Sequence, residues 1–274
     1  MFRWNKPRWC WAGAIGLGLV PILAILALAI FLFWNAAGAS VQIGLRELAA
    51  TRWSPQQGQY GVALLLTGTL AVTALALFLA VPVALCAAGY LALSAGGKVR
   101  AAANAAIGLL GGIPSVVIGL WAMTWVVPVF GNSWISASVA LALMIVPTIT
   151  LLSGAALRLV PADLLEASRA LGMSEGIVAR VAFHHARWGI LSAVVLGTSR
   201  ALGEAVAVSM VAGNVASWPS LTRPIATLTT TLIVELDAAA GLHRNALYLL
   251  ACIVLLAISA LSIFGRAAQR KAGI

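Results

Sequence analysis

Six long apolar stretches constrain the fold of this chain more than any other feature of its sequence. They cover about residues 11–34, 62–93, 102–130, 135–157, 189–213 and 246–265. A helix needs about 20 apolar residues to cross the hydrocarbon core of a bilayer, and each stretch reaches that length. Backbone groups must pair within the chain in lipid, which favours helices, and the alternating segments typical of a barrel are absent. The sequence therefore predicts an all-α, polytopic membrane protein with about six transmembrane helices.

The composition also indicates a membrane environment. Of the 274 residues, 62% are hydrophobic and only 9% are charged, whereas soluble chains average roughly 25% charged residues. A water-soluble protein does not leave so much apolar surface in water. No linker or internal repeat divides the chain, so we expect one transmembrane domain over residues 1–274.

The basic residues predict the orientation of the helices. Cytoplasmic loops carry an excess of Lys and Arg. With both termini inside, twelve of the 17 Lys and Arg residues lie on inner segments, four lie on outer loops, and Arg200 lies within a span. We therefore expect cytoplasmic N- and C-termini, and the net charge of +10 needs no nucleic-acid partner.

Several chemistries have no support in the sequence. Cys10, Cys86 and Cys252 lie far apart and form no Cys-x-x-Cys pair, and the three histidines lack zinc spacing. No metal site or cofactor is expected. The chain contains no Gly-x-x-x-x-Gly-Lys-Ser/Thr run for a nucleotide, and no soluble catalytic domain, so we do not expect an enzyme.

Two opposite charges inside the fifth apolar stretch are the first candidate site. Arg200 and Glu204 lie four residues apart, which places them on one face of a continuous helix. A charge at the bilayer centre costs about 2.5–3.5 kcal/mol on insertion scales, so both are expected to face protein or water. The Arg fork suits an oxyanion, and Glu204 is expected to hold it in place. A buried ion pair that only fixes helix packing is the alternative.

Two further segments are candidates for moving parts. The inner loop 158–188 is predicted to form two short helices joined at Gly172, and an ordinary amphipathic loop is the alternative. The run from Gly111 to Ser115 places glycines and a proline inside a span, which favours a broken helix that lines a substrate path. Close helix packing explains this run equally well. The same two explanations apply to Pro147 and Thr148. A short helix within 224–236 is expected in the outer segment 214–245.

The inner loop resembles the EAA coupling loop of bacterial ABC-importer permeases, with Glu166, Ala167 and Gly172 at matching positions. More specifically, the chain is similar to the PstC-type permeases of the phosphate-specific transport system. The stretches that carry this resemblance are Trp53-Ser54-Pro55, Thr67-Gly68-Thr69-Leu70, Gly112-Ile113-Pro114-Ser115-Val116-Val117, Arg200-Ala201-Leu202-Gly203-Glu204, Gly213-Asn214 and Gly241-Leu242-His243. The loop departs from the family at Val181-Ala182-Phe183-His184, where an Ile-x-Leu-Pro ending is usual.

The resemblance implies a type I ABC importer permease fold, with its core at about 62–265, in the bacterial inner membrane. It implies ATP-driven phosphate import, with ATP hydrolysed in a separate subunit. The implied partners are a PstA-type sister permease, a PstB-type ATPase dimer and a periplasmic PstS-type phosphate-binding protein. On this basis we expect Arg200, Glu204 and Ser115 to line the substrate pathway. The ATPase is expected to dock at Glu166, Ala167 and Gly172.

Three other functions remain open from the residues alone. A permease for sulfate, molybdate or phosphonate would use the same arginine chemistry. An ATP-independent channel or secondary transporter is disfavoured because inverted repeats, common in such folds, are not evident. A structural membrane scaffold is disfavoured by the charges inside a span.

Overall fold

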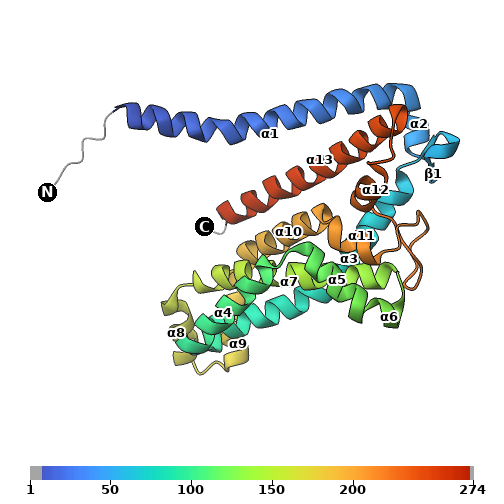
Figure 1. Ribbon diagram of the computed structural model, residues 1–274. Coiled ribbons are helices and arrows are strands. Elements are labelled where there is room, and N and C mark those ends of the chain that lie inside the picture. The colour runs from blue at the N-terminus through green and yellow to red at the C-terminus, as the bar shows by residue number, and fades with distance from the viewer. Residues whose placement is uncertain (1–7, 272–274) are drawn as a thin grey trace.

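The computed structural model describes residues 8–271, and the side chains of residues 18–44 and 46–271. Arg3 and Lys6, which contribute to the orientation argument, and the side chain of Cys10 lie outside that part. The described chain is almost entirely helical (Figure 1). Its elements are α1 (Arg8–Ile43), α2 (Leu45–Leu48), β1 (Trp53–Ser54), β2 (Gln59–Tyr60), α3 (Ala63–Gly89), a π-helix (Tyr90–Ser94), α4 (Gly97–Gly112), α5 (Ser115–Trp125), α6 (Val127–Phe130), α7 (Trp134–Arg158), α8 (Ala162–Ala170), α9 (Glu175–His185), α10 (Arg187–Gly203), α11 (Val206–Val211), α12 (Leu228–Glu235) and α13 (Gly241–Lys271).

All six predicted stretches are helical, but two of them are broken. Four segments are continuous and apolar enough to cross a membrane: Gly18–Ile43, Ala63–Ser94, Trp134–Arg158 and Gly241–Lys271. α4 and α5 form a fifth candidate, bent by 90°. The stretch 189–213 consists of α10, which has 17 residues, and the short α11. The expected single helix through this last stretch is therefore wrong in detail, because the chain leaves helical geometry after Gly203.

The centre of the bundle is α7, which packs against α3 on one side and α10 on the other. Small residues bring the backbones of α3 and α7 together, including Ala76, Ala80, Ala137 and Ala140, all fully buried. Packing of this kind holds helices together in lipid, where apolar contacts alone give little preference for protein over solvent.

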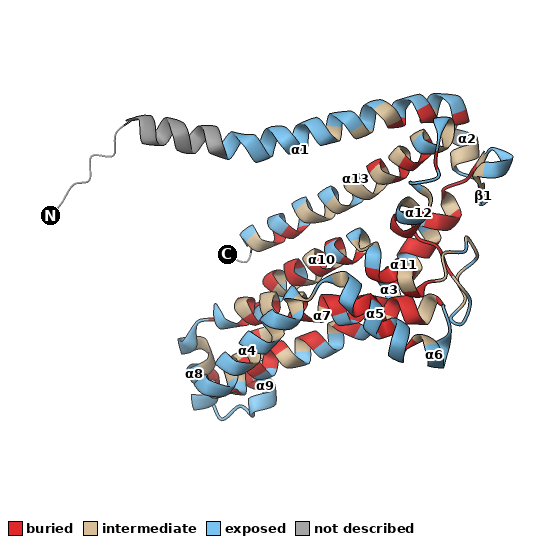
Figure 2. Ribbon diagram, viewed as in Figure 1, coloured by how far each residue is buried: buried red, intermediate tan, exposed pale blue. Residues whose placement is uncertain are grey.

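One long helix stands away from this core. α1 packs mainly along α13. Figure 2 shows its described side chains, from residue 18 on, as largely exposed, while buried residues gather on α3, α5, α7 and α10. Only 6% of its most apolar window is buried inside the chain. Its apolar surface is therefore available to lipid or to another subunit.

The two ends of the bundle carry different structures (Figure 1). The α8–α9 pair lies at the same end as the C-terminus of α13, and the β1–β2 hairpin, α2 and α12 lie at the other. The prediction of two short helices within 158–188 joined at Gly172 is confirmed, since Gly172 adopts φ +73° between α8 and α9. The helix expected within 224–236 is the shorter α12.

Candidate functional site

A break between α4 and α5 frees main-chain acceptors at the end of α4. α4 ends at Gly112, and Ile113 and Pro114 are extended, with ψ of 130° and 137°. The last carbonyls of a helix lack intrahelical partners, and Pro114 has no N–H to offer. Because α5 starts at Ser115 after a 90° bend, the Gly111 carbonyl has to find its hydrogen bond elsewhere.

A second break separates α10 from α11. Glu204 is extended, with φ −75° and ψ 123°, and α11 begins at Val206. One Glu204 carboxylate oxygen accepts a hydrogen bond from the Ala207 N–H at 3.2 Å. The Thr229 hydroxyl of α12 donates to the Glu204 carbonyl at 2.9 Å. Two main-chain groups at this break, the Ala207 N–H and the Glu204 carbonyl, are thus satisfied by side chains of the chain itself.

Arg200, in the last turn of α10, joins these broken segments to α7. One terminal nitrogen donates to the Thr148 hydroxyl at 3.0 Å, and the other donates to the Gly111 carbonyl at 3.4 Å. The guanidinium faces a cavity of about 430 Å³, which we call the Arg200 cavity. It is lined by Gly108, Gly111, Gly112, Pro147, Thr148, Leu151, Leu152 and Arg200. Arg200 is the charged group of this lining.

The expected pairing of Arg200 with Glu204 is not found. The ion pairs in the described residues are Arg169–Glu175 and Glu235–His243. Since α10 ends between the two residues, Glu204 turns toward α11 instead of following Arg200 along one face. The Arg200 guanidinium therefore makes its hydrogen bonds to uncharged acceptors.

The positions of Ser115 and Thr148 relative to the Arg200 cavity differ from what the sequence indicated. Ser115 is half-buried at the start of α5 but does not belong to the lining of the Arg200 cavity. Thr148 does line it, although sequence reasoning treated packing as an equally good explanation. The signal was a hydroxyl directly after Pro147, the proline inside α7.

The coupling-loop candidates lie on the α8–α9 pair. Glu166 and Ala167 are exposed on α8. Arg169 and Glu175 form a two-point ion pair across the Gly172 turn, with Nε–Oε1 and Nη2–Oε2 distances of 2.8 and 3.2 Å. The hydrogen bond from Arg169 lowers the pKa of the Glu175 carboxyl below its ordinary value. Where the family usually has a proline, α9 continues helically to His185.

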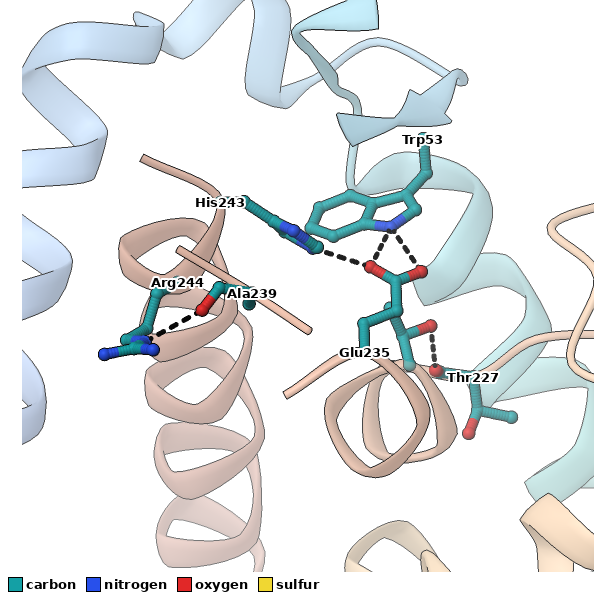
Figure 3. A network of polar contacts seen from close by, with 7 residues as sticks. Trp53, Thr227, Glu235, Ala239, His243 and Arg244 are labelled. Carbon is teal, nitrogen blue, oxygen red and sulfur yellow. Dashed lines mark hydrogen bonds and ion pairs between the residues drawn. The ribbon is translucent and has the colours of Figure 1, made fainter. Parts of the chain in front are cut away.

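At the opposite end, an acidic residue ties three segments together (Figure 3). Both carboxylate oxygens of Glu235, at the end of α12, accept from the Trp53 indole N–H at 3.0 Å. His243 of α13 lies 2.8 Å from the same carboxylate. Sequence reasoning named Trp53 and His243 in matching stretches and missed their contact through Glu235.

Broken membrane helices, a cationic cavity between them and a helical hairpin beyond one end define the chain as a multi-pass transport protein. The family model for the binding-protein-dependent transport system inner membrane component matches residues 80–273, and the chain belongs to this family. It is thus a permease subunit of an ABC importer, a class of transporter that works with an ATPase and a binding protein.

The comparisons with individual proteins are consistent with the PstC-type resemblance. The chain is 34% identical to phosphate transport system permease protein PstC 1 of Mycobacterium tuberculosis, covering 84% of this chain and 81% of that protein. It is 30% identical to PstC of Haemophilus influenzae, covering 82% and 83%. Among solved structures, an inward-facing MetNI methionine ABC transporter matches with a TM-score of 0.57, 23% identity, and coverage of 73% of this chain and 93% of that chain. The expected type I ABC importer permease fold is thereby confirmed.

Proposed function

We propose that the chain forms half of the translocation pathway of an ATP-driven phosphate importer. The observation that carries this proposal is the Arg200 guanidinium, which faces a cavity among α4, α7 and α10 and has no carboxylate partner in the described part of the chain. A charge in that position is costly unless a counter-charge visits it. Relatives that cover most of the chain are named phosphate transport permeases, and a planar fork of N–H donors fits phosphate oxygens.

Arg200 acts as the anion contact of the pathway. Its two hydrogen bonds go to uncharged oxygens and use two of its five N–H donors. The remaining donors and the full positive charge are available to an entering anion. Glu204 contributes by fixing the start of α11 after the end of α10. Ser115 lines the pathway outside the Arg200 cavity, at the start of α5.

The α8–α9 pair couples the pathway to the ATPase. Glu166 and Ala167 present an exposed face of α8, and the Arg169–Glu175 ion pair joins α8 to α9 across Gly172. α9 leads directly into α10, which carries Arg200. Displacement of α8 is thereby transmitted to the cavity. The proposed partners are a PstB-type ATPase dimer, a PstA-type sister permease and a PstS-type binding protein, with this hairpin and both termini in the cytoplasm.

The test is phosphate uptake by the reconstituted importer with Arg200→Gln. Removing a hydrogen bond to a charged group costs about 1.5–3 kcal/mol, so uptake should fall roughly 10- to 150-fold. Arg223→Gln on an outer loop is the matched control, because its side chain is exposed, and it should transport normally. Uptake by Arg200→Gln at the rate of the control refutes the site.

The choice of anion is tested separately. Excess unlabelled sulfate, molybdate or phosphonate is added to the same assay. Phosphate uptake that survives each competitor supports the proposed substrate, and selective inhibition by one of them assigns the importer to that oxyanion.

A further inference from the structure

The two groups that hold Arg200 are both hydrogen-bond acceptors, and neither is charged. Thr148 Oγ1 lies 3.0 Å from one guanidinium nitrogen, and the Gly111 carbonyl oxygen lies 3.4 Å from the other. Both belong to the lining of the Arg200 cavity. A site built only to attract an anion needs donors, so acceptors beside the cation require an explanation of their own.

The Thr148 hydroxyl is not committed to its own helix. Thr67, Thr69, Thr150 and Thr198 each donate to a carbonyl three or four residues earlier. In the described structure Thr148 makes no such bond and only accepts from Arg200. Its hydroxyl is therefore able both to donate to a ligand oxygen and to accept from a ligand hydroxyl.

The Gly111 carbonyl can only accept. It belongs to the last turn of α4, and the Ser115 N–H that would reach it in a continuous helix lies beyond the 90° bend. Its hydrogen bond to Arg200 is long, and a carbonyl oxygen has two lone pairs. A ligand atom that displaces or shares this contact must bring a hydrogen, or the acceptor is left unsatisfied.

This requirement separates oxyanions that arginine alone does not. At neutral pH inorganic phosphate retains at least one P–OH group, whereas sulfate has none. Phosphate can place charged oxygens on Arg200 and donate its P–OH to Gly111 or Thr148. Sulfate can accept a hydrogen bond from the Thr148 hydroxyl, but it would oppose an oxygen to the Gly111 carbonyl, which can only accept. A site rejects ligands that leave its polar groups unpaired.

We infer that the Gly111 carbonyl makes the Arg200 cavity selective for an oxyanion that carries a proton, such as hydrogenphosphate, over one that carries none. This inference rests on the proposed anion pathway and adds a source of specificity within the permease itself. Gly111 acts through its main chain, and the Thr148 hydroxyl, which can donate as well as accept, contributes a hydrogen bond to either anion.

The experiment measures anion protection of a cysteine in the cavity wall, so that selection by the binding protein does not intervene. Leu152→Cys is introduced into the full importer complex with the three native cysteines replaced by serine. The rate of its modification by an anionic methanethiosulfonate reagent is measured against phosphate and sulfate. We expect half-maximal protection by phosphate at a concentration roughly fivefold or more below that needed for sulfate. One net hydrogen bond, at about 1 kcal/mol, gives a difference in affinity of this size.

Variants separate this inference from the pathway itself. Thr148→Val keeps the side-chain shape and should weaken the protection by phosphate and by sulfate to a similar degree, so that the preference for phosphate is retained, whereas Thr148→Ser should protect like the parent. Equal protection by both anions in the parent background, or a preference that disappears in Thr148→Val, overturns the inference and leaves the anion site standing. Phosphate protection that persists in Arg200→Gln overturns the site, and the inference with it.

Discussion

The break at Glu204 allows a test of whether Glu204 stabilises the start of α11 or is required as a negative charge for transport. Ala205 precedes α11 and has no side-chain acceptor, so the Glu204 carboxylate supplies the hydrogen bond to Ala207 at 3.2 Å. Loss of a capping side chain costs about 0.5–2 kcal/mol. A hydrogen bond to a charged group contributes about 1.5–3 kcal/mol and a neutral one about 1 kcal/mol. We therefore expect Glu204→Ala to destabilise the protein by about 2 kcal/mol and Glu204→Gln by about half as much.

Both variants are compared by thermal unfolding of the purified complex and by phosphate uptake. Glu204→Gln should lower the unfolding midpoint slightly and retain most uptake, because the amide oxygen still accepts from Ala207. Glu204→Ala should lower both. If Glu204→Gln unfolds like the wild type but transports as poorly as Arg200→Gln, the negative charge itself is required and the capping argument is refuted.

Two other features give predictions of their own. A Cβ on Gly68 would clash with the Ala226 carbonyl oxygen, so Gly68→Ala should lower the free energy of unfolding by about 1–3 kcal/mol. Gly18→Ala is the control, because Gly18 has open space around it, and it should leave the thermal unfolding midpoint unchanged. Equal midpoints for the two variants would contradict the packing of α3 against residues 225–226. Because the folded pKa of Glu175 is depressed, the stabilisation from its pair with Arg169 is complete above the ordinary carboxyl pKa and is lost as the pH falls through the lowered value. Hydrogen exchange at the Gly172 turn, corrected for intrinsic rates, should rise only in that acidic range, and Glu175→Gln should remove the transition.

Features recorded in local composition were predictable from the sequence. The six apolar stretches all became helices, and the hairpin of α8 and α9 formed around Gly172, whose φ of +73° is a conformation that glycine adopts without cost. Gly112 and Pro114 also mark the α4–α5 break, although the sequence left packing as an equal explanation.

The partners of Arg200 were not predictable in the same way. Thr148 and Gly111 are 52 and 89 residues away along the chain, and only the packing of α4 and α7 beside α10 brings them together. The spacing of Arg200 and Glu204 indicated a shared helix face, which holds only if the helix continues. The end of α10 is stabilised by a residue distant in sequence, because the Thr229 hydroxyl donates a hydrogen bond to the Glu204 carbonyl. The residues near Glu204 alone therefore did not predict this end.

The acceptor at Gly111 has an unusual consequence for how such a pathway changes over generations. A main-chain oxygen is present whatever codon stands at that position, so point mutation does not delete it. Only Thr148, or a change that rebuilds the bend before Pro114, is open to gradual adjustment. Descendants of this protein would therefore inherit the main-chain contact to Arg200 unaltered and vary only the side-chain contact.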